Sequence, residues 1–312
     1  MANNDLGPVV CVGMGVIGCG WACYFASQGV EVRAWDPDPG SRALLDRTLA
    51  QAWPAMEALG LAPGASPDRI VFGKSVEELL DGAVLIQESA PERLELKREL
   101  LAKLDRESPR EAIIASSTSG YPVSDLTTVC TRAPERVVVG HPFNPVYLLP
   151  LVEVVAGPGT SGAVLDRAQG FYESVGKTVL RLDKEVDGFV ADRLQEAMWR
   201  EALHMVANGE ASVEQLDLAI TAGPGLRWAL MGPMLTFHLA GGEGGMAQML
   251  AHFGPSLESP WSRLAAPALT DALRGEVVAG CEREAAGRSV ADLVRERDAG
   301  LVAVIQALRG LS

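Results

Sequence analysis

Ser119, His141 and Glu153 are three polar residues from the middle of the chain that could together remove a proton from an alcohol. Imidazole is a suitable base near neutral pH, and a carboxylate bonded to its far nitrogen fixes the tautomer and favours the imidazolium. A serine hydroxyl can steady the oxygen as negative charge builds on it. The combination indicates oxidation of a secondary alcohol by hydride transfer, although each residue taken alone could be structural, for example as a helix cap.

A glycine-rich segment near the N-terminus could bind the dinucleotide that accepts the hydride. The sequence Gly13-Met14-Gly15-Val16-Ile17-Gly18 follows an apolar run at 8–12 and opens a predicted helix at 16–28. In this context the first glycine allows a tight turn, the second lets the backbone approach a pyrophosphate, and the third allows close packing of helix and strand. The N-terminus of the helix offers free N–H groups to the phosphates. The predicted cofactor-binding residues here are Gly13, Gly15, Val16, Ile17 and Gly18.

Asp36 lies 21 residues after Gly15, at the end of a second predicted strand over 30–35. A carboxylate in this position accepts hydrogen bonds from the adenosine ribose hydroxyls. It would also repel the additional phosphate of NADP, and Asp38 adds to that repulsion. The sequence therefore predicts NAD as the cofactor.

Alternating strands and helices must position these residues. Further apolar runs of strand length occupy 70–73, 83–88, 112–117, 136–141 and 151–155, and helical patterns such as 91–105 separate them. This alternation predicts an α/β fold with a mostly parallel, Rossmann-type sheet, in which His141 ends a strand at the carboxyl edge that faces the ligand. Beyond about residue 186 the patterns are helical, as at 188–209, 212–223 and in the tail after 255. We expect a Rossmann domain over 1–186 and an all-helical domain over 187–312.

Composition excludes several other classes of protein. The 40 acidic residues outnumber 27 basic ones, giving a net charge of −13 without a basic stripe, which argues against a nucleic-acid partner and is compatible with a cationic substrate. The five cysteines have neither the spacing of a disulfide framework nor that of a metal site, so we expect reduced thiols, no metal and a cytoplasmic protein. Residues 1–7 do not resemble a signal peptide, and no apolar stretch is long enough to span a membrane.

Several ordered motifs resemble the 3-hydroxyacyl-CoA dehydrogenase superfamily. They are GMGVIGCGWA, PERLELKRELL, ASSTSG, GHPFNPVYLLPLVEVV, GFVADRLQ and GPGLRWALMGP, and they extend over nearly the whole chain. The resemblance implies a Rossmann domain followed by a helical domain that binds substrate and makes a homodimer. It also implies that His141 and Glu153, twelve residues apart, are the catalytic pair, that Ser119 is the active-site serine, and that Asn144 lies beside cofactor and active site.

Asp192 departs from the acyl-CoA enzymes, which have an asparagine at the matching position. An ionised aspartate cannot donate a hydrogen bond to a thioester carbonyl, but it can attract a cation. Glu196 and Trp199 follow Asp192 near one face of the predicted helix, and Trp228 comes later. Tryptophan rings bind quaternary ammonium groups, so Asp192, Trp199 and Trp228 are predicted substrate-binding residues. The alternative is that both tryptophans belong to the core or to a dimer interface.

Within the superfamily, HPFNPVYLLPLVEVV, ADRLQEAMWREALH, GLRWALMGP and HLAGGEGGM most resemble the branch that acts on carnitine. This resemblance implies NAD-dependent oxidation of the 3-hydroxyl of L-carnitine, a small 3-hydroxy acid with a trimethylammonium group. Its carboxylate needs a donor, for which the candidates are Arg193, Arg200 and Arg227. The alternatives are an L-gulonate 3-dehydrogenase related to lambda-crystallin, a 3-hydroxyacyl-CoA dehydrogenase, and a non-catalytic NAD-binding structural protein.

Overall fold

A computed structural model describes residues 6–258 and 262–310 of the chain. They form two compact units, one containing the residues up to Asp192 together with Arg295–Gly310, and the other Arg193–Val294. The polar N-terminal residues 1–5 lie outside the described residues, as do 259–261 and 311–312 of the expected helical tail. The division of the chain at 192 comes six residues after the predicted boundary at 186, and the C-terminal helix packs with the first unit instead of the second.

The first unit is built on one sheet of eight strands in the order β3-β2-β1-β4-β5-β6-β7-β8. All neighbours pair in parallel except β6 and β7, which are antiparallel because they follow each other without a helix between them. This confirms the mostly parallel Rossmann-type sheet, and it includes a last strand, β8, that the sequence patterns did not identify. The strands are β1 (Val9–Val12), β2 (Val32–Trp35), β3 (Ile70–Phe72), β4 (Leu85–Glu88), β5 (Ile113–Ser116), β6 (Val137–Pro142), β7 (Leu151–Val155) and β8 (Thr178–Leu182).

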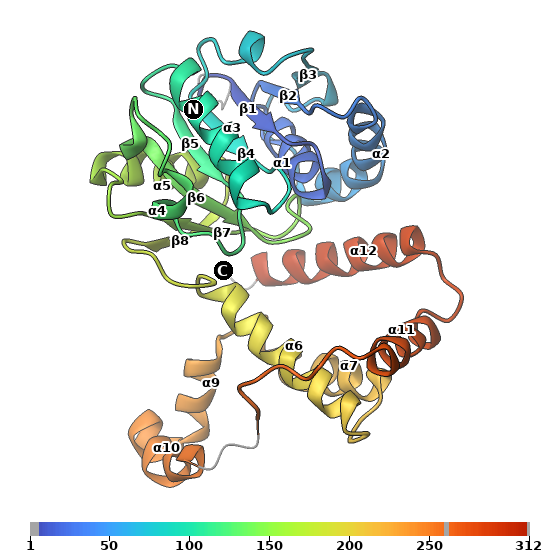
Figure 1. The fold of residues 1–312 in the computed structure, drawn as a ribbon. Helices are drawn as coiled ribbons and strands as arrows, with labels where there is room; N and C mark the ends of the chain where they lie inside the picture. Colours follow the sequence, from blue (N-terminus) through green and yellow to red (C-terminus); the bar gives the residue numbers. More distant parts are fainter. Residues whose placement is uncertain (1–5, 259–261, 311–312) are drawn as a thin grey trace. The chain divides into compact units, whose positions relative to one another are not determined.

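Helices cover both faces of this sheet (Figure 1). Successive residues of β1 point to opposite faces, so that Val9 and Cys11 join one apolar core while Val10 and Val12 join the other. This explains why the strand is a continuous apolar run without alternation. The first core packs against α1 (Val16–Ser27), α2 (Ser41–Leu59) and α5 (Gly162–Ser174), and the second against α3 (Leu94–Glu107) and α4 (Val123–Leu126).

The second unit contains helices and no strand among its described residues, which confirms a helical domain after the sheet. Its helices are α6 (Ala191–Ala207), which begins in the first unit, α7 (Val213–Thr221), α8 (Pro224–Trp228), α9 (Pro233–Ala240), α10 (Gly245–Phe253) and α11 (Asp271–Ala285). Ser212 caps the N-terminus of α7 and forms a reciprocal capping box with Gln215. In the described part of the chain, we find no helix with both the length and the apolar character needed to cross a bilayer.

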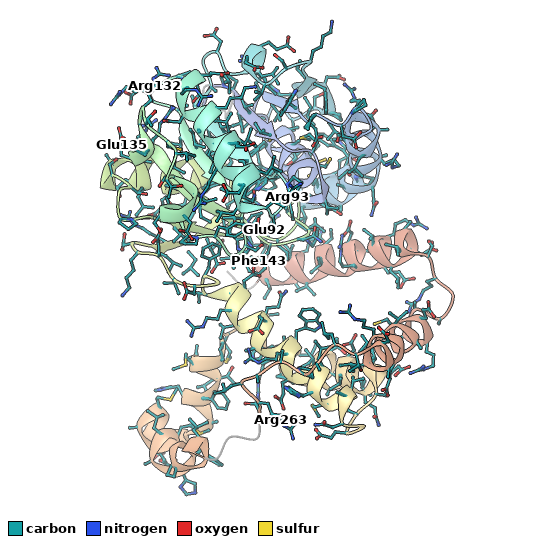
Figure 2. The ribbon with its side chains drawn as sticks, viewed as in Figure 1. Glu92, Arg93, Arg132, Glu135, Phe143 and Arg263 are labelled. Atoms are coloured by element: carbon teal, nitrogen blue, oxygen red, sulfur yellow. The ribbon has the colours of Figure 1, made fainter. Side chains whose placement is uncertain are left out.

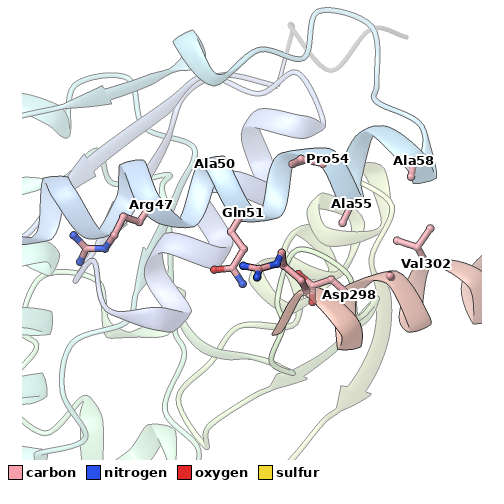
Figure 3. Close-up of a pocket in the computed structure, with 10 residues that line it drawn as sticks. Arg47, Ala50, Gln51, Pro54, Ala55, Ala58, Asp298 and Val302 are labelled. Atoms are coloured by element: carbon pink, nitrogen blue, oxygen red, sulfur yellow. The ribbon is translucent and has the colours of Figure 1, made fainter. Parts of the chain in front are cut away.

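The C-terminal helix α12 (Val290–Arg309) returns to the first unit and packs beside α2 (Figure 3). Gln306 and Arg309 donate to the carbonyls of Ala58 and Leu59, the last residues of α2, at 2.8 and 2.7 Å. These carbonyls have no partner within their own helix, so α12 caps α2. A groove of about 670 Å³ lies between the two helices.

Candidate active site

The glycine-rich turn lies between the end of β1 and the start of α1. A Cβ on Gly13 would lie 2.6 Å from the backbone of Ser89, and its φ of +88° favours glycine. A Cβ on Gly18 would lie 1.8 Å from the carbonyl oxygen of Gly13, so this glycine is required for the helix to approach the strand. A Cβ on Gly15 would meet nothing within 4 Å and would instead fill open space at the N-terminus of α1. Gly13 and Gly18 therefore hold the turn, while Gly15 leaves room for a ligand.

Beside this turn lies a pocket of about 700 Å³ between the ends of β1, β2 and β4. Asp36 lines it and uses both carboxylate oxygens on the backbone, accepting from the N–H groups of Met14 at 2.7 Å and of Asp38 at 2.8 Å. Each oxygen keeps a second lone pair that a ribose hydroxyl can use. Val16 and Ile17 contribute backbone N–H groups at the start of α1, while their side chains are exposed and packed on the core, respectively. The pocket therefore offers space and hydrogen-bonding groups for a dinucleotide.

His141 and Glu153 are direct partners in the antiparallel pair of β6 and β7. Nδ1 of the imidazole lies 2.9 Å from Oε2 of the carboxylate, and both side chains are buried. Because the carboxylate accepts from Nδ1–H, the neutral ring has its free lone pair on Nε2. Ser119 Oγ lies 3.2 Å from that Nε2 atom. The structure therefore brings the three residues of the predicted catalytic set within hydrogen-bonding distance.

Glu153 is also bound by the start of α6. Its Oε1 accepts from the backbone N–H groups of Val190 and Ala191, both at 2.9 Å. Gly188 and Phe189 aim these groups inward through a turn in which both have positive φ, +64° and +52°. Burial raises the pKa of Glu153, but the hydrogen bonds from His141, Ala191 and Val190 outweigh it and leave the pKa below its usual value. The carboxylate therefore stays ionised beside the imidazole.

Asp192, the next residue of this helix, lies on the other side of the ring. Its Oδ2 is 3.5 Å from His141 Nε2, the nitrogen that would take the proton. Burial and the charge of Glu153 raise the pKa of Asp192 above its usual value, although the nearby His141 opposes this effect. A carboxylate thus lies on each side of the imidazole.

Two phenylalanines enclose the imidazole. The ring of Phe143 is 5.2 Å from that of His141, edge to face, and Phe189 lies at 5.4 Å. Asn144, which follows Phe143, is exposed, and no hydrogen bond of its side chain joins it to another described residue. Its predicted place beside the cofactor stays a prediction.

Sequence reasoning missed the acidic residue that holds the Ser119 loop. Glu92 accepts from the backbone N–H of Ser119 at 3.1 Å and from the hydroxyl of Thr118. Lys97, fully buried in α3, lies 3.3 Å from Glu92 and 2.9 Å from the buried carboxylate of Glu88. Glu92 and Phe143 lie at the same edge of the first unit, where β4 and β6 end (Figure 2). The signal in the sequence that could have identified Glu92 was its position shortly after a predicted strand, as for Asp36.

The remaining predicted substrate-binding residues lie in the second unit. Trp199 and Trp228 are 64% and 40% exposed, so neither belongs to a core of this chain. Arg200 already pairs with Glu196 at 2.8 Å, which leaves Arg193 and Arg227 as the candidates without an ion pair among the described residues. The part of these residues in binding substrate stays a prediction.

Two domain models of one protein family match this chain. Residues 8–186 match the NAD binding domain of 3-hydroxyacyl-CoA dehydrogenase, and residues 188–274 match the C-terminal domain of that family. The L-carnitine dehydrogenase of Streptomyces griseus is 60% identical over 98% of this chain and 91% of its own length. The L-carnitine dehydrogenase of Bacillus cereus is 51% identical over 99% of this chain and 94% of its own length.

Solved structures of two dehydrogenases have a similar fold over most of this chain. An NAD⁺-dependent 5-formyl-3-hydroxy-2-methylpyridine 4-carboxylic acid 5-dehydrogenase superimposes with a TM-score of 0.83 at 26% identity, covering 97% of this chain and 98% of its own. The (S)-3-hydroxybutyryl-CoA dehydrogenase of Ralstonia eutropha superimposes with a TM-score of 0.62 at 26% identity, covering 90% and 94%. With both domains matched in order over most of its length, this chain belongs to the 3-hydroxyacyl-CoA dehydrogenase family.

Proposed function

We propose that this protein oxidises the 3-hydroxyl of L-carnitine to 3-dehydrocarnitine, with NAD as the hydride acceptor. The observation that carries the proposal is the pair of carboxylates beside His141, with Glu153 on Nδ1 and Asp192 3.5 Å from Nε2. The high identity to L-carnitine dehydrogenases over nearly the full chain supports the same substrate.

The position of Asp192 suits carnitine in particular. The hydroxyl that loses its proton must lie against Nε2 of His141, and the trimethylammonium nitrogen of carnitine is only two carbon atoms away from that oxygen. A carboxylate beside Nε2 is therefore close to the cation, whose charge it balances in a partly buried place. A 3-hydroxyacyl-CoA offers a neutral thioester and no cation here, which disfavours it.

The chain's own residues account for the proton. His141 Nε2 takes it from the hydroxyl, and the ionised Glu153 stabilises the imidazolium that forms. Ser119 Oγ donates to the reacting oxygen as charge develops on it. Gly15, the N–H groups of α1 and Asp36 would hold NAD, which accepts a hydride from the substrate carbon when bound.

The test is the rate of NADH formation, measured by absorbance, with L-carnitine, D-carnitine, L-gulonate and 3-hydroxybutyryl-CoA. We expect the highest kcat/KM with L-carnitine, and a much lower value when NADP replaces NAD. A higher kcat/KM with gulonate or with the CoA thioester would overturn the proposed substrate, and equal values with NADP would overturn the cofactor preference.

We also propose that two copies of the chain form a homodimer through the helical unit. Of the apolar side chains described within residues 193–294, only Val206 and Leu273 are buried. Many large ones are exposed instead, among them Leu194, Trp199, Leu218, Leu226, Trp228, Leu230, Met234, Leu235, Phe237, Leu239, Leu250 and Phe253. A surface this apolar is typical of an obligate interface, and a second copy of the chain would supply a matching apolar surface.

A further inference from the structure

The loop between His141 and Glu153 is held by a buried lysine, Lys177. His141 lies near the end of β6 and Glu153 near the start of β7, and residues 143–150 connect these antiparallel strands. A two-residue turn would set the register of such a pair by its own geometry, but this longer connection cannot. Its centre is packed inside the protein, with Val146, Tyr147 and Leu148 all less than a tenth exposed. Contacts within the core must therefore hold the loop.

Lys177 supplies the main polar contacts. Its side chain is 4% exposed, and Nζ donates to the carbonyls of Val146 at 2.6 Å and of Leu149 at 2.9 Å. Buried carbonyls need a donor, and the amine has enough N–H groups for both of them in either protonation state. The next residue, Thr178, begins β8 and donates its N–H to the carbonyl of Pro150 at 2.9 Å. Lys177 thus connects the loop to the strand that pairs with β7.

The same amine also contacts the helix that follows the glycine-rich turn. Nζ lies 3.7 Å from the ring centre of Tyr24 and 5.1 Å from that of Trp21, both on α1. Burial lowers the pKa of Lys177 well below its usual range, which agrees with a position away from water. Val146 packs on α1 as well, since a Cβ added to Gly20 would lie 3.0 Å from its Cβ. One side chain therefore touches both the catalytic loop and the dinucleotide-binding helix.

We propose that Lys177 is a positioning residue for alcohol oxidation. It holds the loop that carries His141 and Glu153 at a fixed place against α1, and so fixes the imidazole relative to the cofactor site. This inference rests on the proposed dehydrogenase function, and it assigns no chemical step to Lys177 itself.

The test compares Lys177→Met, which keeps the length of the side chain but removes the donors, with Lys184→Met, which alters an exposed lysine. Displacement of reacting groups by fractions of an ångström costs rate, so we expect kcat of Lys177→Met to fall between about 10- and 100-fold. We expect KM for carnitine and the Kd for NAD to change less than about threefold. The primary isotope effect on kcat with 3-deuterated carnitine should rise, because hydride transfer becomes slower than the other steps. Lys184→Met should match the wild type.

A merely structural role gives a different result. A less stable variant has fewer active molecules, so kcat falls while the isotope effect is unchanged, and that outcome would overturn the proposal. Unchanged kcat would overturn it too. If Lys177→Met does not fold, Lys177→Gln is measured in the same way, since its amide can still donate to one carbonyl.

A second measurement separates this inference from the choice of substrate. The proton of the His141 Nδ1–H group, bonded to Glu153, should give a downfield NMR resonance without any substrate, assigned by its loss in His141→Gln. We expect it to shift upfield or broaden in Lys177→Met and to stay in place in Lys184→Met. An unchanged resonance in Lys177→Met would overturn the role of Lys177, whereas inactivity of the wild type with carnitine would overturn only the proposed substrate.

Discussion

The two carboxylates beside His141 have opposite pKa shifts, and the structure gives the reason. Glu153 accepts two backbone N–H groups and the imidazole, so its charged form is stabilised despite full burial. Among the described residues Asp192 has no such backbone donors, and its burial together with the charge of Glu153 raises its pKa. Pairs of acids whose environments move their pKa values apart commonly have separate roles. Here Glu153 suits the stabilisation of an imidazolium, and Asp192 suits a substrate cation.

Replacement of His141 by alanine should remove the base. We expect kcat to fall by about 10²- to 10⁴-fold, the usual contribution of a positioned general base, while the Kd for NAD stays within about twofold. Steady-state rates and a fluorescence titration with NADH measure the two effects. His252→Ala, at an exposed histidine, is the matched control. A near-normal kcat in His141→Ala would exclude the mechanism.

Replacement of Asp192 by asparagine should weaken the binding of carnitine. Loss of one nearby charge corresponds to about 1.4 kcal/mol, or about tenfold in KM, when the group is partly buried. Because Asp192 attracts a cation only when ionised, KM of the wild type should fall as the pH rises through its raised pKa. The variant should lack this dependence of KM on pH. Asp187→Asn, at an exposed aspartate before the helix, should behave as the wild type, and equal KM profiles for Asp192→Asn and wild type would contradict the assignment.

At the scale of elements, different glycines of the glycine-rich turn serve packing and ligand binding. Gly13 and Gly18 have backbone atoms where a Cβ would be, whereas Gly15 faces open space at the start of α1. The hairpin of β6 and β7 makes a similar division, because its strands place His141 opposite Glu153 while its loop packs on α1. The turn and the hairpin therefore each have one part that maintains the fold and another part that places groups of the candidate site.

Alanine substitutions at two of these glycines should have different effects. Gly15→Ala should fold with a Tm close to that of the wild type but bind NAD at least about tenfold more weakly, because its methyl group occupies the approach of the pyrophosphate. Gly18→Ala should lose about 1–3 kcal/mol of unfolding free energy, as is typical of overpacking. Thermal unfolding and NADH titration of both variants measure this. A large loss of Tm in Gly15→Ala would show that this glycine also serves packing.

At the scale of the whole molecule, the two units differ in how they are stabilised. The first has two apolar cores on the faces of its sheet and includes α12, whose Asp298 accepts from the buried hydroxyl of Tyr147 at 2.8 Å. The second has only two buried apolar side chains among its described residues. Burial of apolar surface is the main stabilising contribution to folding, so we expect the second unit to be stabilised by a partner surface.

The chain should therefore be a dimer in solution, with twice the 33.0 kDa mass of one chain in light scattering. A double substitution, Leu226→Lys with Met234→Lys, places charges on two side chains that are 68% and 70% exposed in the single chain. We expect this variant to lose either the dimer or the cooperative unfolding of its helices. Val129→Lys, on the first unit, should keep both the dimer and the cooperative unfolding. A monomeric wild type would contradict the proposed assembly.

The sequence alone was sufficient for the fold class, because it depends on local patterns. Apolar runs and their alternation with helices predicted seven of the eight strands, and the glycine spacing predicted the turn and its Asp36. The resemblance to the family motif implied the pairing of His141 with Glu153, and the antiparallel strands place the two residues opposite each other. The apolar runs did not predict β8, because its segment, Thr178–Leu182, lies at an edge of the sheet and includes polar residues.

Only the tertiary structure decided which distant groups meet. The contacts of Glu153 with the start of α6, of Glu92 with the Ser119 loop, of Lys177 with the hairpin loop and of Asp298 with Tyr147 join residues far apart in the sequence. The physical reason is that local propensity depends on neighbouring residues, whereas the partner of a buried polar group depends on how the whole chain packs. The residues next to Lys177 in the sequence do not identify the carbonyls of Val146 and Leu149 as its partners, and only the tertiary structure does.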